Sequence, residues 1–463
     1  MPISRFQSSL FLFLTPLFNL IGQNDTVQIV SQVEGGRKWL LPIVEIPMVN
    51  ILTNRVNVWI KDEDWARVSL KSWKANLKTG FKTDGDKFST NFMGHPVHGS
   101  WYFNAARSSG SSYWASLPYT VYGSTMWEYF GETEAPSEID INTTCFGGFM
   151  LGEITHRLSR LLLADDKRRN NRFLRNFSAF AINPLAMING ALYADVRKKL
   201  TAPEKDYLRL RSQLCTGINI PVGQISDERV TTRLHFSYDL IYGSLYDGES
   251  KYKPFDFFVF RTWADLGLTK VKNPFLFNLT SHSPLGIWKI NERCILAISQ
   301  HYDFLKNQIF ELGNISITTD VYYRINQANR QWLLSIKTGI IPFGSTTSEV
   351  TQYLIAEGLL APTRNYIYGG GLALECQTSL RFRTLGRIAL NYNRWLLYPR
   401  KEAKGREQSH IVYFNYAFPL GNKHGLAIEW YHYFRKASYQ ELPGFFDIRK
   451  QYTEFRLMGS YTF

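Results

Sequence analysis

The sequence has no run of about 18 uninterrupted apolar residues after its first twenty-odd positions, the length that a membrane-spanning helix needs. Its mean hydropathy of −0.22 likewise does not indicate a helical membrane protein. Cysteine is scarce, with four residues in 463 and no C-x-x-C pair, which argues against a zinc knuckle or a disulfide framework. H-E-x-x-H, G-x-S-x-G, Walker A and G-x-G-x-x-G motifs are absent from usable contexts, so no standard catalytic class is indicated.

The net charge of +14 raises the question of nucleic acid, but the lysines and arginines are scattered and no nucleic-acid motif occurs. We therefore expect no nucleic-acid partner, and a basic protein facing anionic lipid headgroups explains the charge. Residues 1–22 are typical of a secretory signal, with Arg5 followed by an apolar stretch over residues 10–21. Residues 23–58 are interpreted as a linker or an extended segment. The sequence thus predicts an exported protein.

The last stretch, residues 451–463, alternates strictly enough to predict a strand with two different faces. Phe455, Leu457, Tyr461 and Phe463 fall on one face, and the other face is mainly polar. One face suits lipid and the other suits water. The segment resembles the C-terminal strand of bacterial outer-membrane proteins, and this resemblance implies that the barrel assembly machinery reads Phe463.

Similar alternation recurs after the charged run that ends near residue 171. Firm strand candidates lie near 215–222, 234–240, 255–266, 294–304, 315–325, 332–342, 372–382, 387–395, 410–418 and 426–435, with weaker ones near 173–180, 186–193 and 275–279. Aromatic residues make up 15% of the chain, enough to supply two interface girdles. We predict a mainly β protein whose residues 171–463 form an antiparallel transmembrane β-barrel of about twelve strands, with ten or fourteen as the alternatives. Outer-membrane lipid would then surround it.

Residues 59–170 differ from the rest and predict a helical domain that either plugs the barrel or lies on its periplasmic side. Their motifs are H-P-x-x-G-x-x-Y-x-N-x-A-R from His95, W-E-x-x-x-E from Trp127, and G-G-x-x-x-G-E from Gly147. These motifs resemble the DUF3943 family of uncharacterised bacterial proteins, common in Bacteroidetes, over about residues 60–170. The residues assigned to the structural motif are His95, Pro96, Gly99, Tyr102, Asn104, Arg107, Trp127, Glu128, Glu132, Asp140, Gly152 and Glu153.

His95, Glu128, Glu132 and Glu153 are the candidate catalytic residues, because an imidazole and carboxylates can exchange protons with a substrate. Glu153 and His156 have the E-x-x-H spacing that can hold a metal in helix bundles, although the sequence identifies no metal site and no cofactor. The same residues equally suit buried ion pairs between helices, such as Arg107 with Glu128 or Arg157 with Glu153. We therefore expect a structural, ligand-binding or transport component of the envelope. The alternative is a membrane-embedded enzyme that acts on envelope lipid or glycan through His95 and the Glu128/Glu132 face.

Overall fold

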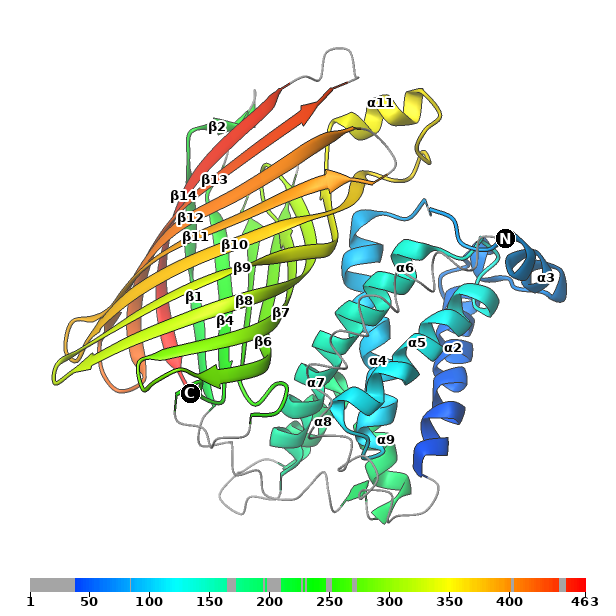
Figure 1. The fold of residues 1–463 in the computed structure, drawn as a ribbon, viewed down its shortest axis with the longest axis horizontal. Coiled ribbons are helices and arrows are strands. Elements are labelled where there is room, and N and C mark those ends of the chain that lie inside the picture. The colour runs from blue at the N-terminus through cyan, green and yellow to red at the C-terminus, as the bar shows by residue number, and fades with distance from the viewer. Residues whose placement is uncertain are drawn as a thin grey trace.

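The chain folds into a β-barrel and a helical domain that lies beside it (Figure 1). The computed structural model describes residues 38–463 except 84, 165–171, 195, 198–209, 226–227, 230, 247–251, 269–272, 401–403 and 441–446. The predicted signal peptide, residues 1–22, lies outside the described residues.

The barrel is closed by antiparallel pairing of the first and last long strands, and it contains twelve strands, as predicted. Around the wall the order is β1-β14-β13-β12-β11-β10-β9-β8-β7-β6-β5-β4. The barrel strands are β1 (Arg211–Val222), β4 (Arg233–Tyr242), β5 (Phe258–Gly267), β6 (Phe275–Lys289), β7 (Cys294–Lys306), β8 (Glu311–Gln327), β9 (Arg330–Thr347), β10 (Tyr366–Phe382), β11 (Gly386–Pro399), β12 (Gly405–Pro419), β13 (His424–Tyr439) and β14 (Ile448–Thr462). The short strands β2 (Gln224–Ile225) and β3 (Glu228–Arg229) pair with each other.

The antiparallel order defines two rims. The C-terminal rim carries Phe463, the connection 243–257 between β4 and β5, and short turns such as 290–293. The opposite rim, here called the distal rim, carries the connection 348–365 between β9 and β10, which includes α11 (Val350–Ala356).

Alternate side chains of each strand face the interior and the outside, as the period of two requires. On β14, Glu454 and Arg456 are 1% exposed inside the barrel, whereas Phe455 and Leu457 are 43% and 51% exposed on the outer wall. The facing predicted for the last strand is therefore confirmed. Other apolar side chains exposed on the outer wall are Leu214, Ile220, Leu234, Phe236, Val321, Ile336, Ile340, Leu372, Leu390 and Ile428.

Side chains fill much of the interior and bridge opposite walls. Arg261 on β5 donates to the Tyr413 hydroxyl on β12 at 2.6 Å, and the Trp395 indole on β11 donates to Asp303 on β7 at 3.2 Å. The Arg456 guanidinium lies 4.2 Å from the ring centre of Tyr431 and ion-pairs with Glu454. A cavity of about 150 Å³ remains between these walls. Its lining includes His301, Asp303, Lys337, Glu375, Gln377 and Tyr413.

The helical domain contains η1 (Lys38–Leu40), α2 (Leu41–Trp59), η2 (Asp64–Ala66), α3 (Leu70–Thr79), η3 (Thr90–Gly94), α4 (His95–Ser108), α5 (Tyr113–Phe130), α6 (Glu138–Asn142), η4 (Thr143–Gly147), α7 (Gly148–Leu163), α8 (Arg172–Ile182) and α9 (Pro184–Leu192). Hydroxyl caps begin several helices, such as Ser69 on α3, Ser112 on α5 and Ser137 on α6. Within the described part of the chain, no helix has both the length and the apolar composition to cross a bilayer.

Two parts of the predicted layout are corrected. Helix α2 occupies the second half of the segment interpreted as a linker, residues 23–58, and residues 23–37 lie outside the described part of the chain. The weak strand candidates 173–180 and 186–193 are the helices α8 and α9, because their apolar residues recur every three or four positions and Asn183 caps α9. The helical domain therefore extends to Leu192, and the first barrel strand begins at Arg211.

The helical domain packs against the outer wall of the barrel (Figure 1). On β7, Gln300 donates to the Phe146 carbonyl at 2.9 Å and Tyr302 donates to the Phe92 carbonyl, whereas the alternate residues His301 and Asp303 line the interior cavity. Because neighbouring positions on a strand face opposite sides, the helices must contact the outside. The helical domain therefore does not fill the lumen, and the expectation of a plug was wrong.

Candidate functional site

A cluster of one imidazole and four carboxylates lies inside the helical domain, and His95 is its first member. The ring is fixed by its position at the start of α4, where Pro96 follows in the first turn. Its Nδ1 lies 3.1 Å from the Thr144 hydroxyl, and its Nε2 lies 3.5 Å from Asp140 Oδ2 and 3.8 Å from Asp86 Oδ2. His95 and Asp140 are buried, with 8% and 3% of their surface exposed.

The carboxylates come from three further segments that hydrogen bonds hold in place. The Ser137 side chain caps α6 by accepting from the Ile139 and Asp140 amides at 3.2 Å, which positions Asp140. The Ser137 amide donates to Glu128 Oε2 at 2.7 Å, which ties the end of α5 to the start of α6. Glu132 lies two residues after the end of α5, and its carboxylate lies close to those of Glu128 and Asp140.

The cluster divides into two sets that share Asp140. One set is Asp86, His95 and Asp140, and the other is Glu128, Glu132 and Asp140. Within each set the ligand atoms lie within 4.8 Å of one another. Two ligands of one ion can be at most about 5 Å apart, since each lies about 2.0–2.6 Å from the metal. The arrangement can therefore hold a divalent cation, or two cations bridged by Asp140.

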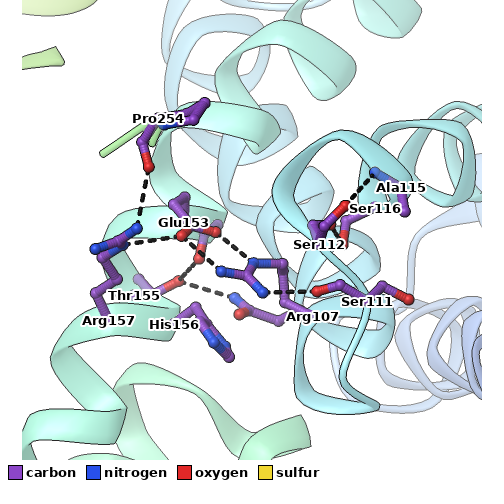
Figure 2. A network of polar contacts seen from close by, with 12 residues as sticks. Arg107, Ser111, Ser112, Ala115, Ser116, Glu153, Thr155, His156, Arg157 and Pro254 are labelled. Atoms are coloured by element: carbon purple, nitrogen blue, oxygen red, sulfur yellow. Dashed lines mark hydrogen bonds and ion pairs between the residues drawn. The ribbon is translucent and has the colours of Figure 1, made fainter. Parts of the chain in front are cut away.

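Glu153, the fourth candidate, lies apart from this cluster and is an ion-pair residue between helices. Figure 2 shows its carboxylate between Arg107 of α4 and Arg157 of α7. The Arg107 Nε and Nη2 donate to it at 2.6 and 2.8 Å, and the Arg157 Nε donates at 2.9 Å. Burial alone would raise the pKa of Glu153, but the two guanidinium groups outweigh burial and lower the pKa to about 2. Of the two predicted pairings, Arg157 with Glu153 is present, and Arg107 pairs with Glu153 rather than with Glu128.

The remaining motif residues join helices. Tyr102 donates to Asn50 of α2, and Asn104 donates to the Thr155 hydroxyl of α7 at 2.8 Å while it accepts from Asn183 at 2.9 Å. Trp127 packs edge-on against His98 at 5.0 Å between ring centres.

The motif glycines make close approach possible between α4 and α7. A Cβ atom on Gly99 would lie 1.9 Å from the Thr144 carbonyl oxygen, and one on Gly152 would lie 2.6 Å from the Phe103 ring. Pro96 packs equally closely against Gly147, where a Cβ atom would lie 2.6 Å from the Pro96 side chain. The motif as a whole thus builds the helix packing that positions His95 and Asp140.

Sequence reasoning missed Asp86, and it missed a second group inside the barrel made of His282, His301 and Asp320. Asp86 belongs to no recognisable spacing, so only the folded chain brings it to His95. In the barrel, His282 Nε2 lies 2.9 Å from Asp320 Oδ2, and His301 Nε2 lies 2.9 Å from the Thr318 hydroxyl. The three residues fall on adjacent strands, and their common inward facing was the available signal.

The fold defines a class of protein. A closed barrel with an even number of antiparallel strands, apolar on the outside and polar within, is an outer-membrane β-barrel. Residues 80–185, which include the whole cluster, match the model of the family described as "Domain of unknown function (DUF3943)". No curated protein matches the chain.

Solved structures with a similar barrel include the COG4313 outer membrane channel from Pseudomonas putida F1, at 7% identity and a TM-score of 0.29, covering 55% of this chain and 95% of that one. Outer membrane phospholipase A from Escherichia coli is 10% identical with a TM-score of 0.27, covering 54% and 92%. The outer membrane channel DcaP of Acinetobacter baumannii is 8% identical with a TM-score of 0.23, covering 55% and 96%.

Proposed function

We propose that this outer-membrane barrel protein binds a divalent cation in its helical domain, through Asp86, His95, Glu128, Glu132 and Asp140. The observation that supports this most directly is the sharing of Asp140 by two sets of potential ligands, each within 4.8 Å. A mixture of one imidazole and several carboxylates suits Mn²⁺, Fe²⁺ or Zn²⁺ better than it suits a soft ion such as Cu⁺.

Burial adds to the argument. Glu128 is fully buried and Asp140 is 3% exposed. Bringing these two buried carboxylates close together costs free energy, because like charges repel each other. A divalent cation at the centre would offset that repulsion and would fix the junction of α4, α5 and α6.

The cation would also give the domain a chemical capability. A bound divalent ion can polarise a substrate oxygen or lower the pKa of a bound water. The enzyme alternative, acting on envelope lipid or glycan through His95 and the Glu128/Glu132 face, would use the same cluster. Glu153 would contribute to it only by holding α4 and α7 together.

The test is the metal content and thermal stability of the full-length protein purified in detergent without added chelator. We expect bound metal in the wild-type protein, and an unfolding temperature that falls with EDTA and recovers with Mn²⁺ or Zn²⁺. His95→Ala and Asp140→Asn should lose the metal and the response to EDTA. Glu132→Gln, at a partly exposed position, is the milder variant should those two fail to fold.

Asp64→Asn is the matched control, because it removes a carboxylate whose side chain is 99% exposed. It should keep both the metal and the response to EDTA. A wild-type protein without bound metal, whose unfolding temperature is the same with EDTA and with added Mn²⁺ or Zn²⁺, would leave the cluster a purely structural hydrogen-bond network.

We also propose that the barrel assembly machinery recognises Phe463 during insertion. Its ring is 67% exposed at the C-terminal rim, and its amide donates to the Ser212 carbonyl at 3.0 Å across the seam where β14 meets β1. A receptor could therefore reach this residue at the point where the barrel closes.

A further inference from the structure

Helix α2 has the opposite polarity from a helix on the surface of a water-soluble domain. Its residues Glu45, Asn50, Asn54 and Asn57 are 4–9% exposed and face the other helices. Its outward side carries Ile43, Val44, Met48, Ile51 and Leu52, which are 40–67% exposed. Water would favour the reverse arrangement, since it solvates amides and excludes apolar surface.

The inward asparagines hydrogen-bond to the neighbouring helices. Asn54 donates to the carbonyls of Ala66 and Gly131 at 2.8 Å, and Asn50 donates to the Gly123 carbonyl at 3.3 Å. Polar side chains that join helices in this way, with apolar residues outside, are typical of helices in contact with lipid.

Two further helices also expose apolar side chains. On α8, Phe173 and Phe177 are 81% and 61% exposed and lie on one helix face. On α9, Ile188 and Leu192 are 43% and 66% exposed. Figure 1 shows α8 and α9 at the lower end of the helical domain that contains α2, toward the C-terminal rim.

The helical domain lies alongside the barrel wall and has contacts near both rims. Near the distal rim, the Phe88 amide donates to Asn365 at 3.1 Å. Near the C-terminal rim, Arg157 ion-pairs with Asp256 of the β4–β5 connection at 3.3 Å. The domain therefore extends along the wall from one rim to the other, over the height that the apolar outer wall occupies.

The contact between the two parts is itself apolar. One buried cluster joins Phe92 and Phe149 of the helical domain with Phe304, Ile315 and Tyr366 of the barrel. Where that contact ends, the exposed apolar wall of the barrel continues, for example at Ile340 and Leu372. Apolar side chains are thus exposed both on the outer wall of the barrel and on the outward surface of α2, α8 and α9.

We propose that the helical domain lies in the bilayer beside the barrel, with the outward surface of α2, α8 and α9 in contact with lipid acyl chains. The inference rests on the membrane location of the barrel and is independent of metal binding. It also means that the His95 cluster is at membrane level.

The test uses nitroxide labels on the full-length protein in vesicles of phosphatidylethanolamine and phosphatidylglycerol, with collision by oxygen and by a water-soluble nickel chelate as the readouts. Labels at Met48, Leu52 and Phe177 should collide more with oxygen than with the nickel chelate. A label at Leu457, on the barrel wall, is the lipid reference. A label at Glu357, in the connection beyond the distal rim, is the water reference.

Three outcomes separate the alternatives. If the label at Leu457 reports lipid while the Met48 and Leu52 labels behave like Glu357, the barrel is inserted and the helical domain is in water, which overturns the inference. If those two labels are shielded from both reagents, protein rather than lipid covers the surface, which also overturns it. If Leu457 itself reports water, the membrane location of the barrel has failed.

The labelling experiment requires that the half-buried Cys294 and Cys376 first be changed to serine. A second measurement needs no labels. Met48→Lys should reduce the amount of folded protein in the outer membrane, and Met48→Leu should not. On a domain surrounded by water, the exposed lysine would be tolerated, so equal recovery of the two variants would contradict the proposal.

Discussion

The ion pairs around Glu153 lead to the sharpest prediction, because they separate a structural role from a catalytic one. Glu153→Gln keeps the shape of the side chain but removes its charge. The change replaces three charge-assisted hydrogen bonds, at 2.6, 2.8 and 2.9 Å, with neutral ones and leaves two guanidinium groups facing an amide. The Arg107 and Arg157 side chains are only 16% and 13% exposed, so water can compensate little.

Removing one partner of a buried ion pair typically costs about 3–5 kcal/mol. A folded domain is stable by about 5–15 kcal/mol, so the variant should lose a large part of the stability of the helical domain. The closed barrel does not depend on this contact and should remain folded. Since the pKa of Glu153 is lowered from 4.5 to about 2, the stability that its charge supplies is complete above pH 4.5 and is lost as the pH falls toward 2.

The assay is limited proteolysis across a denaturant series on the detergent-solubilised protein, which follows cleavage of the helical domain while the barrel remains as a resistant core. Asp64→Asn is the control for loss of charge on the surface. The double variant Glu153→Gln with Arg107→Gln should recover part of the loss, since one unpaired charge is gone. A Glu153→Gln protein as stable as the wild type, but without its cellular phenotype, would refute the structural assignment and favour the enzyme.

Three further predictions concern packing, facing and assembly. Gly99→Ala should destabilise the helical domain by about 1–3 kcal/mol, because its Cβ would overlap a backbone carbonyl, and Gly94→Ala, with open space around it, should be neutral in the same proteolysis assay. Leu390→Arg puts a charge on the lipid side, so it should lower the stability of the barrel by about 2–4 kcal/mol and reduce the amount of heat-modifiable barrel on gels. Gln377→Arg, in the cavity lining, should be tolerated. Equal effects of the two changes would mean that the assigned facing of the strands is wrong. Phe463→Asp should lower outer-membrane insertion and increase periplasmic degradation, and normal insertion in a pulse-chase experiment would contradict recognition of this residue.

The barrel was predictable from the sequence because its signal is local. Strand alternation can be read within ten residues, and it placed Arg456 inside and Leu457 outside without knowledge of any partner strand. The failures arose where local patterns mislead. Helix α2 exposes apolar residues on its outward side and contains Pro42 and Pro47. Its sequence therefore lacks the pattern of an amphipathic helix in a water-soluble domain.

The candidate site was only partly predictable for a different reason. His95, Glu128 and Glu132 stand out by residue type and spacing, but the ligand set is completed by Asp86, whose neighbours along the chain give no indication of it. The ion pair between Glu153 and Arg107, which are 46 residues apart in sequence, depends on the packing of α4 against α7. Long-range convergence of this kind is a property of the folded chain alone.

The side chains that cross the barrel have a consequence for electrical behaviour. Arg261 and Tyr413 link one pair of walls, and Trp395 and Asp303 link another, so these side chains narrow the path between the two rims. Removing the Arg261 and Trp395 side chains together should therefore widen that path. In planar bilayers this double variant should pass more current than the wild-type protein.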